Sequence, residues 1–163
     1  MKSSLDDVDA SIRSRLPAQG GSYVLVLQSD LEGRINIGRL GSLKLRRGFY
    51  LYVGSAFGPG GLRARVGRHA QRHKPLRWHI DYLRARTQLK AVVFSIDRQQ
   101  HEEAWSSQIQ GWPDTGIPMP GFGASDSRAS SHLFFLSEWP SGTRFEVLEG
   151  QDLHIIESWE SAD

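Results

Sequence analysis

The chain has 163 residues, 39% of them hydrophobic and 23% charged, which predicts a globular protein with a core of its own. It contains no cysteine, which excludes disulfide bonds and thiolate-ligated zinc, so any metal ion must bind through oxygen or imidazole ligands. No run of about 18 apolar residues occurs, and the first residues are polar and acidic, so we expect neither a membrane span nor a signal peptide. These features are typical of a cytoplasmic protein.

Charge is distributed unevenly along the chain, although the net charge is only +2. Residues 34–90 contain 14 Lys or Arg and one acid, whereas residues 138–163 contain seven acids and one Arg. Clustered basic side chains displace counterions from phosphates, so the basic segment favours nucleic acid as a partner. The same distribution is compatible with a solvated basic surface that is balanced by an acidic tail.

The first part of the chain predicts one helix followed by four strands. The helix is expected over residues 3–16, and Pro17 with the glycines after it ends the helix. Apolar or alternating residues predict strands that form an antiparallel meander, with the second strand as the hairpin partner of the first. These strands are Tyr23–Gln28, Arg34–Gly38, Leu43–Arg46 and Phe49–Val53.

A glycine-rich turn and a basic helix follow the fourth strand. Gly54 and the run Gly58–Gly61 are expected to end the strand, because glycine supplies positive φ. The next residues predict a helix over Leu62–His69, with arginines at the edge of its apolar stripe that can lean over a cleft beside the sheet. The stripe contains Leu62, Val66, His69 and His73, and the edge contains Arg65 and Arg72.

The remaining part of the chain predicts alternating helices and strands. A helix over Leu76–Arg84 would start at Pro75 and bury Leu76, Ile80 and Leu83. The later expected elements are a strand at Leu89–Ile96, a helix at about Gln99–Gln110, a loop at Trp112–Gly123, a strand at His132–Leu136, a further strand at Arg144–Leu148 and a short segment at Leu153–Ile156.

An ordered set of motifs resembles the GIY-YIG nuclease superfamily. Gly21-Ser22-Tyr23 is similar to the first half of its signature, and Tyr52-Val53-Gly54 is similar to the second half. Arg65 matches the helix arginine of that family, and Glu102 matches its metal-binding glutamate. Three longer strings resemble the small stand-alone Uri-type endonucleases: residues 52–65, Trp78–Leu83 and Gly121–Asp126.

The resemblance implies an α/β (α+β) fold, with a small, mainly antiparallel sheet flanked by helices. It divides the chain into an N-terminal helix or extension (1–19), a GIY-YIG-like nuclease domain (20–137) and an acidic C-terminal tail (138–163). Tyr23 and Tyr52 should lie on neighbouring strands, with both hydroxyls on the face that Arg65 approaches. Because these tyrosines are 29 positions apart, we expect an additional strand pair between the two half-motifs.

The function that the resemblance implies is a divalent-metal-dependent endonuclease that hydrolyses phosphodiester bonds in DNA, with Mg²⁺ or Mn²⁺ bound to Glu102. This chemistry needs an activated water and stabilised negative charge on the phosphate oxygens. An arginine supplies the charge, and a tyrosine whose pKa it lowers can orient or deprotonate the water. The catalytic candidates are Tyr23, Tyr52, Arg65, His79 and Glu102. The substrate-binding candidates are Arg46, Arg47, Gly54, Ser55, Arg68, His69 and Arg72.

Helical phase separates Glu102 from Glu103. At about 100° per residue, Glu102 falls on the same face as Trp105 and Ile109, whereas Glu103 does not. A carboxylate that faces a core is costly unless it is paired or binds a metal ion, so Glu102 is the predicted ligand. The alternatives are that Glu102 pairs with a buried arginine or is solvated.

Several interpretations stay open at this level. His69 is either a satisfied core histidine or a site residue, and His79 either assists the base or binds phosphate. The chain could also be an inactive nucleic-acid-binding module of the same fold, or an interaction domain whose acidic tail binds a basic partner. The residues do not distinguish single-stranded, branched or duplex DNA, or RNA, as the nucleic acid.

Overall fold

The computed structural model describes residues 10–124, 129–148, 150 and 153–157. Its centre is a five-stranded antiparallel sheet with the strand order β6-β4-β1-β5-β7. The strands are β1 (Ser22–Ser29), β4 (Gly48–Ser55), β5 (Gln88–Ser95), β6 (Leu133–Leu136) and β7 (Leu153–Glu157). The mainly antiparallel α+β fold predicted from the sequence is confirmed.

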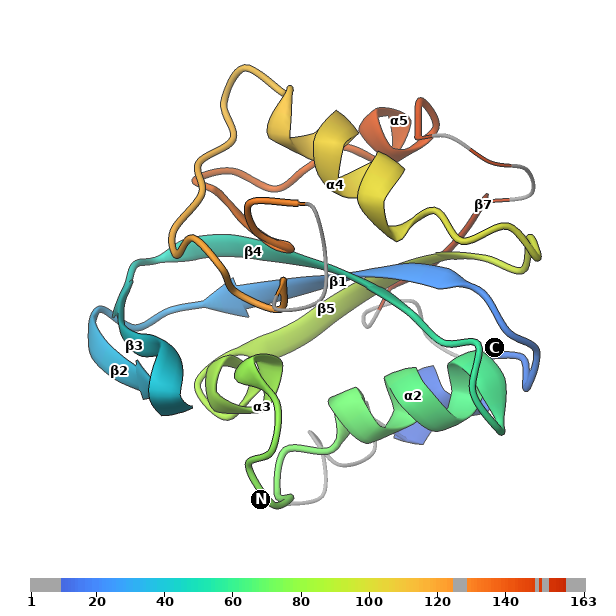
Figure 1. Ribbon diagram of the computed structural model, residues 1–163, viewed down its shortest axis with the longest axis horizontal. Coiled ribbons are helices and arrows are strands. Elements are labelled where there is room, and N and C mark those ends of the chain that lie inside the picture. Colours follow the sequence, from blue (N-terminus) through green and yellow to red (C-terminus); the bar gives the residue numbers. More distant parts are fainter. Residues whose placement is uncertain (1–9, 125–128, 149, 151–152, 158–163) are drawn as a thin grey trace.

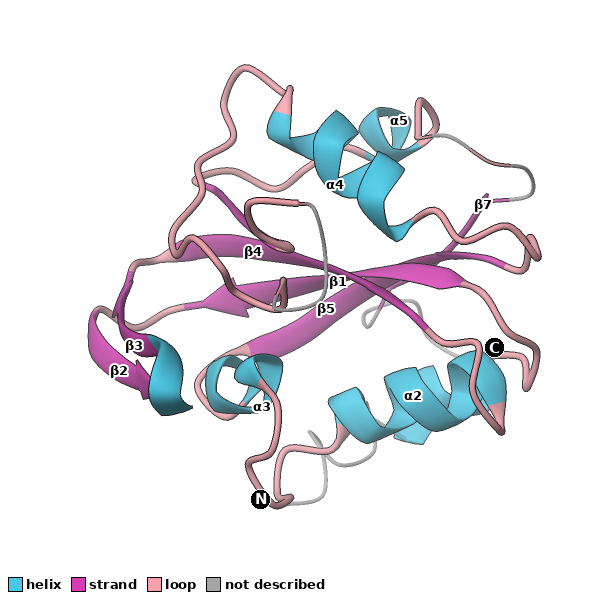
Figure 2. Ribbon diagram, in the orientation of Figure 1, coloured by secondary structure: helices cyan, strands magenta, loops and turns pink. Residues whose placement is uncertain are grey.

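Helices cover both faces of this sheet (Figures 1 and 2). In the view of Figure 1, α2 (Gly61–Ala70) and α3 (His79–Arg84) lie below the sheet, and α4 (Glu102–Gln110) and α5 (Gly142–Phe145) lie above it. Among the described residues, none of the helices is long and apolar enough to cross a membrane.

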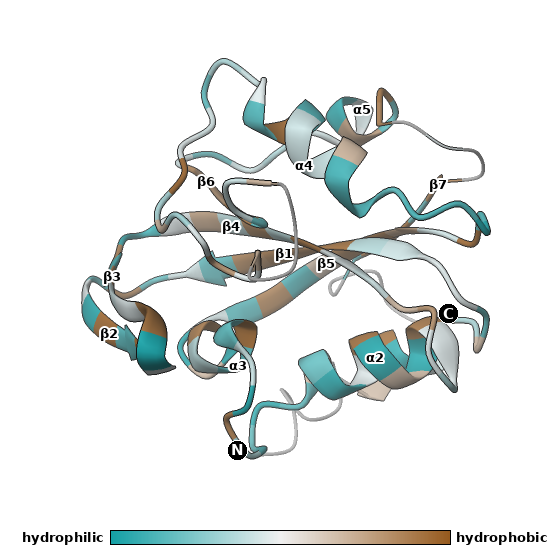
Figure 3. Cartoon of the chain, viewed as in Figure 1, coloured by the Kyte–Doolittle hydropathy of each residue, from teal (hydrophilic) through white to brown (hydrophobic). Residues whose placement is uncertain are grey.

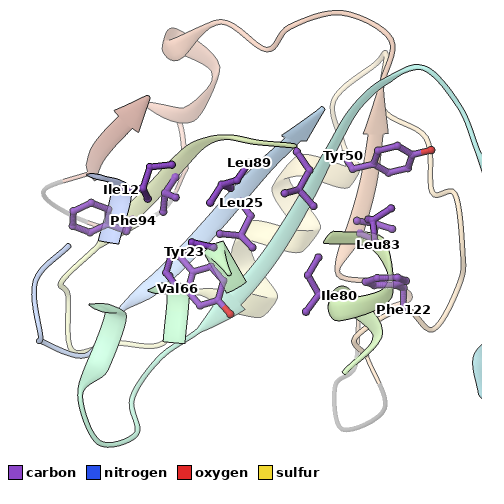
Figure 4. Close-up of a cluster of buried hydrophobic side chains, with 14 of the residues drawn as sticks. Ile12, Tyr23, Leu25, Tyr50, Val66, Ile80, Leu83, Leu89, Phe94 and Phe122 are labelled. Atoms are coloured by element: carbon purple, nitrogen blue, oxygen red, sulfur yellow. The ribbon is translucent and has the colours of Figure 1, made fainter. Parts of the chain in front are cut away.

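The central strand β1 is apolar on both sides, because a layer of helices packs on each face of the sheet. Tyr23 and Leu25 belong to the core cluster shared with α2 and α3, whereas Val24 and Val26 belong to the cluster shared with α4. All four side chains are at most 1% exposed. Figure 3 shows the hydrophobic residues along the strands, and Figure 4 shows the cluster on the side of α2 and α3.

Two further strands, which lie between β1 and β4 in the sequence, form a separate two-stranded sheet. β2 (Gly33–Ile37) pairs with β3 (Gly41–Leu45), and the 3₁₀ turn η1 (Gly38–Leu40) connects them. The expected strand pair between the two half-motifs is therefore confirmed. The expected meander is wrong, because both edges of β1 are occupied by the longer strands β4 and β5, which leaves β2 without access to β1.

Helices α2 and α3 have boundaries that differ from those expected. α3 begins at His79, because the Asp81 carboxylate accepts hydrogen bonds from the backbone amides of Arg77 and Trp78 and caps the helix there. Leu76 consequently lies before the helix and is 50% exposed, so its predicted burial is wrong. α2 ends at Ala70. His73, which was expected on the buried stripe, therefore lies beyond the helix and is exposed.

The two ends of the chain also differ from the expectations. Residues 10–14 are helical, and the expected start of that helix lies outside the described residues. Asp126, the last residue of the string Gly121–Asp126, also lies outside them. The predicted strand at Arg144–Leu148 is wrong, because Arg144 lies in α5, whose buried Phe145 packs in the cluster below α4 and α5. Residues Leu153–Glu157, in contrast, pair with β5 and extend the sheet.

A buried arginine connects α2 with α3. Arg84 is 2% exposed, and its guanidinium donates to the carbonyl oxygens of His69 (3.1 Å), Ala70 (2.8 Å) and Thr87 (2.7 Å). The ammonium of Lys74 also donates to carbonyl oxygens at the end of α2. The last carbonyls of a helix have no partner within it and carry the negative end of the helix dipole, so these two cations cap α2.

Replacement of Arg84 with Met should lower the free energy of unfolding by about 3 kcal/mol or more, because each buried carbonyl left without a donor costs about 1–3 kcal/mol. Urea denaturation followed by circular dichroism measures this change. Arg86→Met is the matched control at an exposed position, and it should change stability by less than about 0.5 kcal/mol. Equal losses in the two variants would show that the buried guanidinium does not stabilise the fold.

Candidate functional site

A cavity of about 530 Å³, called here the central cavity, brings together side chains from both helical layers and from the sheet. All five residues predicted to be catalytic line it: Tyr23 of β1, Tyr52 of β4, Arg65 of α2, His79 of α3 and Glu102 of α4. The other lining residues are Gly54, Ser55, Arg77, Trp78, Gln100 and Gly123.

The register of β1 and β4 places the two tyrosines on one face of the sheet. Tyr52 lies opposite Leu25, two residues from Tyr23, so the two phenols are diagonal neighbours on the same side. This confirms the expectation that neighbouring strands present both rings to one face. Gly54 lies directly opposite Tyr23, and a Cβ at this position would overlap the Tyr23 ring. Gly54 thus lies within β4 and makes room for the ring, instead of ending the strand through a positive φ as expected.

His69 contacts the first tyrosine but does not itself line the central cavity. Its Nε2 atom lies 2.8 Å from the hydroxyl oxygen of Tyr23, and the side chain is 1% exposed. Burial and the nearby charge of Lys74 lower the pKa of His69 to about 3, so the imidazole is neutral at physiological pH. His69 is therefore both a core residue and a partner of a tyrosine in the cavity.

Both phenols are protonated at neutral pH. Burial raises the pKa of Tyr23, the neighbouring Tyr52 raises it further, and Arg65 acts in the opposite direction. Burial also raises the pKa of Tyr52, with a further contribution from Glu102. The expected lowering of a tyrosine pKa by the nearby arginine is present, but desolvation outweighs it.

Arg65 presents its guanidinium to the central cavity from α2. The guanidinium carbon lies 4.6 Å from the centroid of the Trp78 ring, a cation–π contact that restrains the side chain. In the described part of the chain, Arg65 makes no hydrogen bond or salt bridge. Arg68 also stacks on Trp78, at 4.2 Å, but its guanidinium is bound to both carboxylate oxygens of Asp81 at 2.9 and 2.8 Å. Arg65 can therefore bind an anion without breaking an ion pair.

Glu102 lies at the start of α4, with its side chain 22% exposed. Its Oε2 atom accepts hydrogen bonds from Ser55 Oγ (3.0 Å) and Gln100 Nε2 (3.1 Å). Its Oε1 atom lies 3.7 Å from His132 Nδ1. The predicted helical phase is confirmed, because Glu103 is exposed and lines a different hollow. No arginine in the described ranges pairs with Glu102, which removes that alternative.

The donor set suits a hard divalent cation that keeps most of its water ligands. The described residues contain no cluster of three or more His, Asp or Glu side chains, so they do not form an all-protein metal cage. Mg²⁺ typically binds through one or two carboxylates and substrate phosphates while it keeps several waters. A single restrained carboxylate that opens into a cavity, as Glu102 does, fits this mode.

His79 is oriented by the loop that faces it. Its Nδ1 atom accepts a hydrogen bond from the backbone N–H of Gly123, at 2.9 Å. Because Nδ1 accepts, the hydrogen of the neutral ring is on Nε2, which can only donate. Of the two roles expected for His79, the geometry therefore favours the binding of a phosphate oxygen.

Some predicted substrate-binding residues lie away from the central cavity. Arg46 stacks on Phe135 at 4.3 Å, and Arg47 is exposed beside it, before β4 begins. Arg72 donates to the carbonyl oxygen of Thr87, at 3.1 Å. Charge clustering in the sequence does not distinguish these arginines from Arg65, since the topology decides which of them reach the cavity.

Four lining residues were not among the sequence candidates: Arg77, Trp78, Gln100 and Gly123. The string that begins at Trp78 was part of the family resemblance, but nothing in the sequence showed that Trp78 would stack on Arg65. Gln100 precedes α4, and its bond to Glu102 depends on the turn into that helix. Ser55, predicted to bind substrate, lines the cavity and donates its hydroxyl hydrogen to Glu102.

Acid should destabilise the protein through His69. The pKa of His69 is about 3 in the folded protein, whereas an unperturbed histidine, as in the unfolded chain, has a pKa of 6.5. Between these two pH values the unfolded chain therefore binds more protons than the folded protein. Stability from this group is therefore present above about pH 6.5 and is lost as the pH falls towards 3. His69→Gln should flatten the decrease in urea midpoint across this window. His73→Gln, at an exposed histidine, is the control and should keep the wild-type slope.

Comparison with known proteins places this fold and site in a family. Residues 22–149 match the family model described as "Domain of unknown function DUF123". No curated protein and no solved structure matches the chain. The matched region runs from the first residue of β1 to beyond α5 and includes every residue that lines the central cavity. The chain therefore belongs to the DUF123 family, whose function its description leaves unassigned.

Proposed function

We propose that the protein is a divalent-metal-dependent endonuclease that hydrolyses phosphodiester bonds in DNA. We further propose that it belongs to the GIY-YIG superfamily, in the small stand-alone Uri-type branch that its motifs resemble. The observation that carries this proposal is the convergence of five side chains from five elements on one cavity: Tyr23, Tyr52, Arg65, His79 and Glu102. Two phenols, a guanidinium, an imidazole and a carboxylate provide the polar groups that phosphodiester hydrolysis requires.

Arg65 is the group best placed to bind the scissile phosphate. Its guanidinium is restrained against Trp78 and has no hydrogen-bond partner among the described residues. A guanidinium donates two parallel hydrogen bonds to a phosphate, and a donor fixed in advance stabilises charge that develops in the transition state. The Nε2–H of His79 is a second donor to the same cavity.

Glu102 is the proposed metal ligand. Its carboxylate has about four acceptor positions, and the bonds from Ser55 and Gln100 restrain it without using them all. A divalent ion bound there would supply Lewis-acid stabilisation of the negative charge on the phosphate. Ser55 and Gln100 are positioning residues in this scheme, because they act through the carboxylate.

The tyrosines act as neutral hydrogen-bonding groups in the free protein. Burial keeps both phenols protonated, so they orient a water molecule by donating or accepting hydrogen bonds. The contact between Tyr23 and Nε2 of His69 fixes the direction of the first phenol. Between the two roles considered for a tyrosine, the orientation of water is the one that these environments support.

The first test is cleavage of labelled single-stranded, duplex and branched DNA and of RNA, in Mg²⁺, Mn²⁺ or EDTA. Wild-type protein should cut DNA only with the metal, and Glu102→Ala should abolish cleavage while it keeps DNA binding, because the basic side chains are untouched. Glu103→Ala is the matched control and should retain activity, since Glu103 lies outside the central cavity. Nucleic-acid binding by a wild-type protein that never cuts would make the inactive binding module the correct function.

The role of Arg65 gives a second test. Arg65→Ala should lower the cleavage rate about a hundredfold or more, the scale measured when one charge-stabilising donor is removed from an active site. Arg65→Lys should recover only part of this loss, because an ammonium cannot reproduce the planar fork of donors. Single-turnover kinetics separate this effect from product release. Arg86→Ala, at an exposed position, should cleave at the wild-type rate, and full activity in Arg65→Ala would remove Arg65 from the mechanism.

A further inference from the structure

A second cavity, of about 160 Å³, lies next to the central cavity and shares Arg65 with it. It is formed by the residue after β4, the glycine-rich turn and α2 as far as Arg68. Its lining residues are Ala56, Gly58, Pro59, Gly61, Ala64, Arg65 and Arg68. Arg65 therefore lines both cavities.

The charged side chains that line the second cavity are both cationic. Arg65 has no hydrogen-bond partner among the described residues, and Arg68 is paired with Asp81, which does not line the cavity. The first amides of α2 are already bonded, since Leu62 N–H donates to Gln19 O and Arg63 N–H donates to Pro17 O. A ligand here would consequently be held by guanidinium groups and not by the end of the helix, which favours an anion such as a phosphate group.

Small residues keep the second cavity open. Gly60 and Gly61 have φ values of +81° and +57°, which explains why glycine occupies these two positions. Gly58 has no such backbone requirement, and a Cβ at Gly58 would meet no atom within 4 Å. The folded chain itself therefore gives no reason for glycine at position 58, whereas a ligand in the cavity that it lines would.

We propose that the second cavity binds the phosphate adjacent to the scissile one on the same nucleic-acid strand, with Arg65 between the two phosphates. This inference rests on the proposed function, which assigns the scissile phosphate to the central cavity. A guanidinium has five N–H donors, so one arginine can bind two neighbouring phosphates. The substrate class is therefore an oligonucleotide, and an isolated phosphodiester would use only the central cavity.

The test adds bulk at two residues that line the second cavity, with Gly58→Val on the turn and Ala64→Leu on α2, both at exposed positions. Each variant should raise the KM for a short oligonucleotide about tenfold, the scale of one charge-assisted hydrogen bond, with kcat within about twofold of wild type. For bis(4-nitrophenyl) phosphate, which has no adjacent phosphate, the KM or the inhibition constant should stay within about twofold. Affinity for a fluorescent oligonucleotide in EDTA, measured by anisotropy, should fall by the same factor as 1/KM.

The control is Gly116→Val, the same substitution at a glycine that also has no atom within 4 Å of its Cβ position and that lies outside both cavities. It should leave all constants unchanged. Wild-type behaviour of Gly58→Val and Ala64→Leu towards the oligonucleotide would overturn the inference and leave the proposed function standing. Equal losses for both probes would also overturn it, since the substitutions would then act on the central cavity. A wild-type protein that binds but does not cut would instead refute the proposed function, and the anisotropy measurement would then decide only whether the second cavity binds a phosphate of the strand.

Discussion

The geometry of the site depends on the capping of α2 by buried cations. Arg84 and Lys74 come from the segment that follows α2, and both donate to the carbonyls at its C-terminal end. Burial of a guanidinium is costly, and here three carbonyl acceptors and the negative end of the helix dipole offset that cost. This capping fixes α2, which carries Arg65, relative to α3, which carries His79, so the two helices present their side chains to the same cavity.

Asp81 extends this charged network towards the cavity. Hydrogen bonds from Arg68 and from the backbone amides of Trp78 and Arg77 outweigh the effect of burial and lower the pKa of Asp81 to about 2. The carboxylate thus stays charged, holds Arg68 and determines where α3 begins. Trp78 is fixed at this point, and its ring supports Arg65. The ion pair of Arg68 with the buried Asp81 therefore positions Arg65 through Trp78.

The sequence predicted those features that depend on local pattern. The period of apolar residues identified β1, β4, β5 and β6 of the main sheet and the face on which Glu102 lies, because burial on a strand or helix repeats with its geometry. Long-range choices were not accessible in this way. The pairing of β2 with β3 depends on which strands occupy the edges of β1, and the role of Arg46 depends on its distance from the cavity along β4. Trp78 illustrates the difference between the two. The motif that begins at Trp78 could be recognised in the sequence, but its contact with Arg65 depends on how α2 packs on α3.

Glu102 couples the proposed metal site to the two tyrosines. Its negative charge is one of the contributions that raise the pKa of Tyr23 and of Tyr52, whereas Arg65 opposes it. Neutralisation of this carboxylate by a bound cation would remove that contribution and lower both pKa values, since a nearby positive charge favours the phenolate. The phenols would therefore be most acidic when the carboxylate is occupied. In the proposed function, the hydrogen-bonding strength of the groups that orient water would thus depend on the presence of the cation that stabilises the phosphate.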